Sequence, residues 1–268
     1  MDDHSSGKGT EAHRSKWPGR LCELAEILAI TVAIALAVKL FVIDAVHVPS
    51  ASMEKTLQAG DFILVNKLIY GPRTPLFMPV TGRRIPSLRC PSPVFPRVND
   101  VLVFSFPDDS AGTHPTYVKR LIGLPGDTVE IRDGTVIVNG TARMRAAHAR
   151  WPSRPPLDYG PVVVPRRGDV LDLRTDPPEH WEPLVRREGH SVMRTSAGKF
   201  SIDGREAQQY RLEEDHYFVL GDNIDNSSDS RSWGFVPFDH ILGQAMFVYW
   251  SRDSSGNVRW KRLGTLVR

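Results

Sequence analysis

The hydrophobic and polar positions divide the chain into one long apolar run followed by many short ones. The long run covers residues 24–43, in which only Glu26, Thr31 and Lys39 are polar. An α-helix rises ~1.5 Å per residue, so a run of this length reaches about 30 Å, the thickness of the hydrocarbon core of a membrane. We therefore expect a transmembrane anchor helix at residues 23–44.

Positive charges flank this run unequally. Arg14, Lys16 and Arg20 precede it closely, whereas no positive charge follows it before Lys55. Basic residues concentrate on the cytoplasmic side of membrane helices, so the pattern predicts a cytoplasmic N-terminal tail at residues 1–22 and a single pass through the cell membrane. A cleaved secretory signal is the alternative, but the run is longer than a usual signal core and no clean A-x-A site follows it.

Residues 45–268, the expected extracytoplasmic domain, contain short β-branched or aromatic runs separated by Gly, Pro, Asn and Asp. This spacing is typical of antiparallel β structure. The runs are DFILVNKLI, DVLVFSF, YVKRLIGL, TVEIRDGTVIVNG, PVVVPRRGDVLDL, HYFVLGD and GQAMFVYWS. The DG within IRDGTVIVNG suits a tight hairpin turn. We predict a mostly β fold with an antiparallel β-sheet core, preceded by the anchor helix.

Two stretches interrupt this pattern. Residues 72–96 hold seven prolines and four arginines, which indicates a long ordered or semi-ordered loop. Residues 144–212 are polar and variable in texture, with a strand pair in PVVVPRRGDVLDL and the later GKFSIDGREAQQYRL. We expect this second stretch to form a smaller inserted lobe.

Composition excludes several classes of function. The net charge is +3 and the basic residues are spread out, so a nucleic-acid patch is not expected. Cys22 and Cys90 form no CxxC, and no HExxH occurs, so neither a disulfide nor a metal site is predicted. The acidic segment around Asp222 and Asp225 lacks the residue spacing of a calcium loop.

Three segments hold residue types that packing alone does not explain: PSASMEKTL at 49–57, YVKRLIGLPGD at 117–127 and GDNIDNSSDSRSWGFVP at 221–237. The first and third are rich in hydroxyls, and a nucleophilic serine needs a base. The histidines stand in no recognisable motif. A lysine in apolar surroundings can serve instead, because burial disfavours its charged form.

Each candidate also has a structural interpretation. Ser52 can be a cap for the turn that follows it, which is the commoner role of a serine in such a position. Lys119 can be a solvated lysine on a strand. Strand alternation places it on one face with Tyr117 and Leu121, which slightly favours burial, but the same argument applies to Arg120 on the other face. The residues alone do not choose between these two bases.

In their order after an N-terminal anchor, PSASM, GDFILVNKLIYG, DVLVF, YVKRLIGLPGD, GDNIDNSSDSRSWGFVP and GQAMFVYWS resemble the bacterial type I signal peptidases of the Ser-Lys class. The resemblance does not cover the Pro-rich loop or most of the inserted lobe. It implies a membrane-bound serine endopeptidase that removes signal peptides from exported preproteins, cutting after small residues in an A-x-A pattern. It implies no cofactor, and its partners would be preprotein signal peptides, membrane lipid and the secretion machinery.

The resemblance also implies a role for individual residues. Ser52 matches the nucleophile and Lys119 the general base, in preference to Arg120. Ser50 matches an oxyanion-hole hydroxyl that acts with the backbone N–H of Ser52, and Ser227 matches a hydroxyl that orients the lysine. The charged residues expected to brace the third segment are Asp229, Arg231, Asp222 and Arg120. The positions expected to bind substrate are Val48, Pro49, Met53, Tyr117 and Val118.

The chain departs from the family pattern at two places. Ile224 stands where many members carry a charged residue, in GDNRDN. The Pro/Arg-rich loop, with Leu76, Phe77 and Met78, is outside the pattern, and we expect it to rest on the membrane surface.

Two alternatives come from other classes of protein. A Ser-Lys self-cleaving repressor would need a DNA-binding helix-turn-helix in place of the anchor. A non-enzymatic membrane-tethered β module would leave Ser52, Lys119 and Ser227 interchangeable with Ala, and it would not explain the three segments together.

Overall fold

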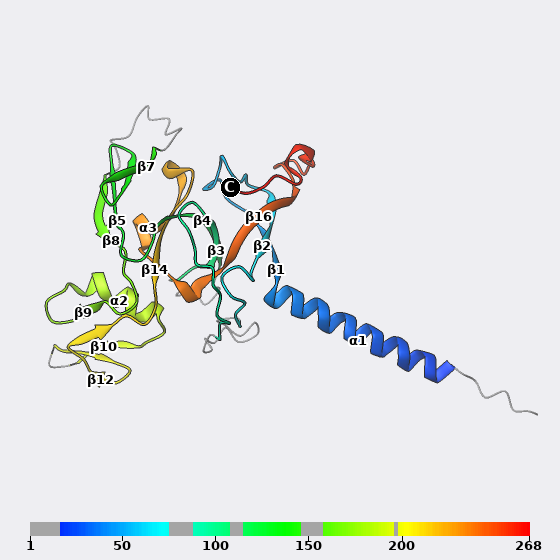
Figure 1. Ribbon diagram of the computed structural model, residues 1–268, viewed down its shortest axis with the longest axis horizontal. Helices are drawn as coiled ribbons and strands as arrows, with labels where there is room; N and C mark the ends of the chain where they lie inside the picture. Colours follow the sequence, from blue (N-terminus) through cyan, green and yellow to red (C-terminus); the bar gives the residue numbers. More distant parts are fainter. Residues whose placement is uncertain (1–16, 75–87, 108–114, 146–157, 196–197) are drawn as a thin grey trace, which may run out of the picture. The chain divides into compact units, whose positions relative to one another are not determined.

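We describe the protein from a computed structural model, and the residues that it describes are 17–74, 88–107, 115–145, 158–195 and 198–268 (Figure 1). The expectations for Arg14 and Lys16 and for Leu76, Phe77 and Met78 fall outside these residues. The chain divides into two compact units, Met1–Lys39 and Leu40–Arg268. Each unit is considered by itself.

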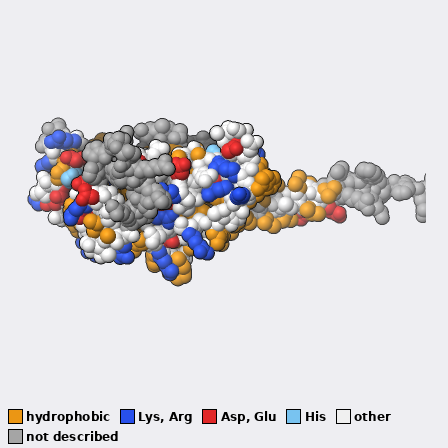
Figure 2. Space-filling view, turned by 90° about the horizontal axis from the view of Figure 1, so that it is seen from above, with side chains coloured by type: hydrophobic (Ala, Val, Ile, Leu, Met, Phe, Trp, Pro, Cys, Tyr) orange, Lys and Arg blue, Asp and Glu red, His pale blue; other side chains and the backbone are white. Residues whose placement is uncertain are grey.

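The first unit is almost entirely the helix α1 (Trp17–Phe41). Its segment Cys22–Phe41 is long and apolar enough to cross a membrane, and its apolar side chains are exposed along its length (Figure 2). The helix ends three residues before the predicted boundary at Asp44. The reason is that Ile43 already belongs to a strand, in which it pairs with Asn66.

The main sheet of the second unit is antiparallel throughout its described strands. Their order is β1 (Ile43–His47), β2 (Asp61–Asn66), β16 (Ile241–Ser251), β3 (Val101–Ser105), β4 (Thr116–Gly123), β14 (His216–Leu220) and β15 (Val236–Pro237). The long β16 joins β2 to β3, with register shifts along both of its edges. The predicted mostly β, antiparallel fold is confirmed.

A second antiparallel sheet follows β4 along the chain. Its order is β7 (Thr141–Arg145), β6 (Thr135–Val138), β5 (Thr128–Arg132) and β8 (Tyr159–Val163). Asp133 and Gly134 connect β5 to β6, and both have positive φ, at 49° and 69°. Positive φ at both central residues is the requirement of a tight I′ hairpin turn, as the DG predicted.

From Val170 to Arg211, the described residues of the predicted inserted lobe form one helix and two small sheets. The helix is α2 (Pro178–Arg187), and the sheets are β10 (Val192–Arg194) with β11 (Phe200–Ile202) and β12 (Arg205–Glu206), and β9 (Val170–Asp172) with β13 (Gln209–Arg211). In Figure 1 these elements gather at one end of the second unit. β9 and β13 form the strand pair that the sequence predicts, whereas β8 pairs with β5 outside the lobe.

Apolar side chains fill both faces of the main sheet. Val101 and Val103 of β3 belong to one buried cluster, whereas Leu102 and Phe104 belong to another. Successive residues of a strand point to opposite faces, so the two clusters lie on the two sides of the sheet. The first cluster also contains Met53, and it therefore anchors the segment around Ser52 to the sheet.

Candidate active site

Ser52 lies in a tight turn that follows β1. The backbone N–H groups of Thr56 and Leu57 both donate to the carbonyl of Met53, which closes the turn without help from a serine side chain. Met53 and Leu57 are fully buried in the core cluster, so the turn is fixed against the sheet. The Ser52 hydroxyl is thus free of a capping role in this turn, and its partner lies elsewhere.

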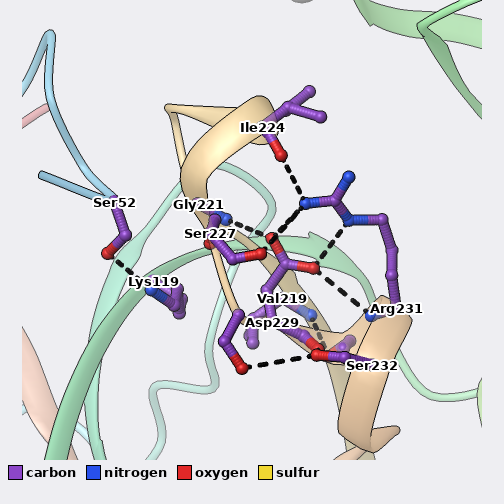
Figure 3. A network of polar contacts seen from close by, with 11 residues as sticks. Ser52, Lys119, Val219, Gly221, Ile224, Ser227, Asp229, Arg231 and Ser232 are labelled. Carbon is purple, nitrogen blue, oxygen red and sulfur yellow. Dashed lines mark hydrogen bonds and ion pairs between the residues drawn. The ribbon is translucent and has the colours of Figure 1, made fainter. Parts of the chain in front are cut away.

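That partner is Lys119, in the middle of β4. Its Nζ lies 2.6 Å from Ser52 Oγ, and its side chain is 4% exposed (Figure 3). Burial lowers the pKa of Lys119 from 10.5 to about 8, because the ammonium loses its hydration shell. The charges of Asp229 and Asp222 raise this pKa and that of Arg231 lowers it, but all three act less strongly than burial.

A pocket of about 240 Å³ opens beside the Ser52–Lys119 pair. Ser50 also lines this pocket, and its Oγ lies 3.2 Å from Ser52 Oγ. Its walls come from β1 with the following turn and from β4 with the residues before it. The lining residues are His47, Val48, Pro49, Ser50, Ser52, Met53, Pro115, Thr116, Tyr117, Val118 and Lys119. All five residues predicted to bind substrate line this pocket.

The third predicted segment forms a loop between β14 and β15 that includes η1 (Ile224–Asn226) and the short helix α3 (Ser230–Trp233). Asp229 is fully buried, and its carboxylate pairs with the guanidinium of Arg231, with Oδ1 2.7 Å from Nε. The same carboxylate accepts a hydrogen bond of 3.1 Å from the backbone N–H of Gly221. Arg231 also donates to the Ile224 carbonyl at 2.8 Å. The charged pair thus connects the beginning of the loop, at Gly221 and Ile224, to α3.

Gly221 and Ser227 lie between the Ser52–Lys119 pair and the Asp229–Arg231 pair in Figure 3. Within the described part of the chain, the buried Ser227 Oγ has no hydrogen-bond partner. The predicted contact between this hydroxyl and the lysine is therefore not formed in this structure.

Two residues of the loop that the sequence analysis did not single out hold it against the nucleophile. Asn223 donates from its backbone N–H to the Ser52 carbonyl at 3.0 Å and from Nδ2 to the Ala51 carbonyl at 3.1 Å. A Cβ added to Gly221 would lie 2.2 Å from Ser227 Oγ and 2.6 Å from the Ser52 carbonyl oxygen. Both residues belong to the sequence GDN at the start of the third segment. That motif was the sequence signal from which their role could have been inferred.

Arg120, the neighbour of Lys119, has a different set of partners. Its Nε lies 2.7 Å and its Nη2 2.8 Å from the two carboxylate oxygens of Asp222. Nη2 also donates to Thr56 Oγ1, and Nη1 donates to the Asn99 carbonyl. This planar fork ties the first segment to the third. Arg120 and Asp222, the other two residues expected to brace the third segment, are thus in direct contact.

The described residues contain no group of three or more His, Cys, Asp or Glu side chains placed to hold a metal ion. The reactive groups that meet at the site are a hydroxyl and an amine of lowered pKa. This pair is suited to nucleophilic attack on a carbonyl with proton transfer to the amine.

Comparisons with known proteins identify the class. A family model described as signal peptidase, peptidase S26, matches residues 21–250. Signal peptidase I of Pseudomonas fluorescens is 32% identical over 229 residues, which are 81% of this chain and 68% of the relative. Signal peptidase I of Pseudomonas aeruginosa is 31% identical over 87% of this chain and 75% of the relative. That of Aquifex aeolicus is 30% identical over 85% of this chain and 84% of the relative.

The chain therefore belongs to the signal peptidase family, peptidase S26. It is a serine peptidase that removes signal peptides, and the resemblance seen in the sequence is confirmed.

Proposed function

We propose that this signal peptidase works through a dyad in which Ser52 is the nucleophile and Lys119 the general base. The observation that carries the proposal is the 2.6 Å contact between Ser52 Oγ and Lys119 Nζ, made by a buried lysine. A base must lie within hydrogen-bond reach of the proton that it takes, and its pKa must allow the neutral form to exist near working pH. The lowered pKa of Lys119, about 8, supports the second condition.

In the proposed reaction the neutral amine of Lys119 takes the proton of Ser52 Oγ, which attacks the scissile carbonyl carbon. The tetrahedral intermediate collapses to an acyl-enzyme when Lys119 gives the proton to the leaving amine. Lys119 then takes a proton from a water molecule as the water oxygen attacks the ester carbonyl. It returns this proton to Ser52 Oγ when the second intermediate collapses and releases the signal peptide as a carboxylate. Every proton transfer uses the same amine.

The oxyanion of the tetrahedral intermediate needs hydrogen-bond donors that are already in place. We assign this role to the Ser50 hydroxyl and the backbone N–H of Ser52. The 3.2 Å separation of the two serine hydroxyls supports the assignment, because an oxyanion formed at Ser52 lies next to Ser50 Oγ. Loss of one such donor costs ~3 kcal/mol in comparable enzymes.

Ser227 is proposed to orient the lysine while it is protonated. Its buried Oγ has no partner among the described residues, so an oxygen lone pair is available to an ammonium formed during the reaction. Asp229 and Arg231 are proposed to hold the loop that presents Ser227.

The substrate is proposed to bind as an added β-strand with small residues in the A-x-A pattern. β4 pairs with β14 only from Arg120 onward, and no described strand pairs with Thr116 to Lys119 on that side. β1 is likewise an edge strand. The two free backbone edges flank the 240 Å³ pocket, so an extended peptide between them can form main-chain hydrogen bonds.

We further propose that α1 anchors the enzyme in the cell membrane in a single pass. The basic residues before the apolar run support a cytoplasmic N-terminus and an extracytoplasmic peptidase domain. Signal peptides leave the bilayer at that face, where membrane lipid and the secretion machinery are the expected partners.

Cleavage of a preprotein with an A-x-A site by the full chain in detergent tests the dyad. We expect Ser52→Ala and Lys119→Ala each to lower kcat/KM by about 10⁴-fold or more, as losses in a catalytic dyad do. In the wild type, kcat/KM should rise with pH through about 8, because only the neutral form of Lys119 is a base.

Lys199→Ala is the matched control, since Lys199 is a surface lysine of the inserted lobe that pairs with Glu206. It should retain full activity. Cleavage by Ser52→Ala or Lys119→Ala at the rate of this control would refute the dyad, even if the wild type removes signal peptides.

A further inference from the structure

Arg187, the last residue of α2, contacts the loop between β14 and β15 from the inserted lobe. Its side chain is 4% exposed and lies on the buried face of α2 with Trp181 and Leu184. Its Nη1 donates to the Phe235 carbonyl at 3.1 Å, and its Nη2 donates to the Trp233 carbonyl. One planar guanidinium thus bridges two carbonyls of the segment that follows α3.

The bridged segment is the C-terminal end of α3. The N–H of Gly234 donates to the Ser230 carbonyl, and Gly234 has a φ of 89°, a conformation that favours glycine. A Cβ at this position would lie 3.2 Å from Arg187 Nη1, so Gly234 also leaves room for the guanidinium. A cation at this end of the helix is placed where the last carbonyls of a helix attract it.

The N-terminal end of the same short helix contacts the end of β14 and Gly221. Asp229 caps α3 and accepts from the Gly221 N–H, and Ser230 Oγ accepts from the Val219 N–H at 2.9 Å. Gly221 in turn lies against Ser227 and the Ser52 carbonyl. A helix of one turn that is held at both ends therefore connects the inserted lobe to the nucleophile.

We propose that Arg187 is a positioning residue for catalysis, through which the inserted lobe holds α3, and with it Gly221 and Ser227, next to the Ser52–Lys119 pair. The proposal rests on the dyad proposed above. Without the guanidinium, the Trp233 and Phe235 carbonyls lose the hydrogen bonds that Arg187 donates. The helix α3 is then held only at its N-terminal end, through Asp229. Asp229 and Arg231 then move relative to Lys119, and water gains access to the amine.

Lysine is a poor substitute at this position. Its ammonium is a point charge on a flexible stem and cannot reproduce the fixed spacing of the two guanidinium donors that reach two carbonyls at once. Arg187→Lys keeps the charge and one donor, so it should retain part of the function. Arg186→Met is the matched control. Arg186 is the preceding residue of α2 and contacts Glu182 and the Val192 carbonyl within the lobe.

The experiment compares the full-length wild type, Arg187→Met, Arg187→Lys and Arg186→Met in detergent, below the melting temperature of each. It measures kcat, KM and the pH profile of kcat/KM on an A-x-A preprotein. We expect Arg187→Met to lower kcat about tenfold with little change in KM, because the substrate pocket between β1 and β4 is untouched. In Arg187→Met, the acid limb of the kcat/KM pH profile should move to higher pH by about half a unit. The reason is that hydration of the amine returns the pKa of Lys119 toward 10.5.

Arg187→Lys should fall between the wild type and Arg187→Met, and Arg186→Met should keep the wild-type kcat and acid limb. Wild-type kcat and acid limb in Arg187→Met would overturn the proposal, as would equal losses in Arg186→Met. If Arg187→Met does not fold, an unchanged kcat and acid limb in Arg187→Lys would overturn it. The dyad is judged separately, on the wild type and Lys119→Ala alone.

Discussion

Lys119 and Arg120 are neighbours on one strand, and both are buried, but the fold gives them opposite electrostatic surroundings. Arg120 forms a bidentate pair with Asp222, so its charge is compensated in place. Lys119 has a neutral hydroxyl as its nearest partner, and burial dominates its pKa. One cation thus serves as a structural tie, and the other can give up its charge and act as a base.

Gly221 allows the loop between β14 and β15 to approach the nucleophile closely. An added Cβ would meet Ser227 Oγ at 2.2 Å and the Ser52 carbonyl oxygen at 2.6 Å, distances at which something must shift. We expect Gly221→Ala to lower kcat/KM by about 100-fold, because a displacement of about 1 Å in a catalytic group has effects of this size. Cleavage assays on the folded fraction, verified by near-UV circular dichroism, measure the loss.

Gly256→Ala is the control for this substitution, because a Cβ there meets nothing within 4 Å. It should cleave at the wild-type rate. Activity of Gly221→Ala within about threefold of the control would show that the loop can yield without consequence for the site.

At the scale of whole elements, the strands that carry the site could be predicted from the sequence because each is a short apolar run bounded by turn residues. α2 could not, because PEHWEPLVRR has Pro183 in its interior, which disfavours a helix unless packing compensates. Trp181, Leu184 and Val185 supply that packing. Arg187 was missed with the helix, since nothing local indicates that a terminal arginine is buried.

Alternation also had a limit in β4. Every residue of this strand from Val118 to Gly123 is buried, so alternation could not choose between Lys119 and Arg120 as the proposed base. The resemblance to a family made that choice. The lowered pKa of Lys119 depends on burial by residues far away in the sequence, so no local pattern contained it.

The junction of α1 and β1 bears on whether the apolar segment is retained. Ile43 pairs with Asn66, and Asp44 forms a 3.2 Å ion pair with Lys67, so both residues are built into the peptidase unit. Cleavage before Ala45 would remove them from an edge strand. We therefore expect the mature chain to keep α1, and intact-mass measurement of the membrane-extracted protein should give the uncleaved N-terminal segment.

Ser52→Ala serves as the control for this measurement, because it cannot cut its own chain under the proposed mechanism. The same N-terminus is expected in both proteins. A wild-type chain that starts near Ala45 would contradict the anchor and restore the cleaved-signal interpretation of residues 24–43.

At the scale of the whole molecule, segments that lie far apart in the sequence hold one another in place around the pocket. The single side chain of Arg120, on β4, contacts Thr56 in the first turn, Asp222 in the loop after β14 and the backbone of Arg268. Such a site depends on the global fold, so conditions that loosen the peptidase unit should reduce activity together with stability.

His216 makes that global stability dependent on pH. It is fully buried in β14, and burial, with a smaller effect of the Arg187 charge, lowers its pKa from 6.5 to about 4. Its Nδ1 lies 3.2 Å from the Glu214 carbonyl oxygen, which only accepts, so Nδ1 carries the proton of a neutral ring. Between pH 4 and 6.5 the unfolded chain binds more protons than the folded one, so stability falls as the pH falls through this window.

The expected loss is about 2 kcal/mol between about pH 7.5 and pH 5, measured by denaturant unfolding of the full chain in detergent. His216→Asn keeps a donor toward the Glu214 carbonyl but does not titrate. Its loss of stability over the same pH range should therefore be smaller than that of the wild type by about 2 kcal/mol. Other groups, such as the His190–Asp203 ion pair, titrate in both proteins and cancel in the difference. Equal losses in the two proteins would mean that protonation of His216 does not govern the acid limit of this fold.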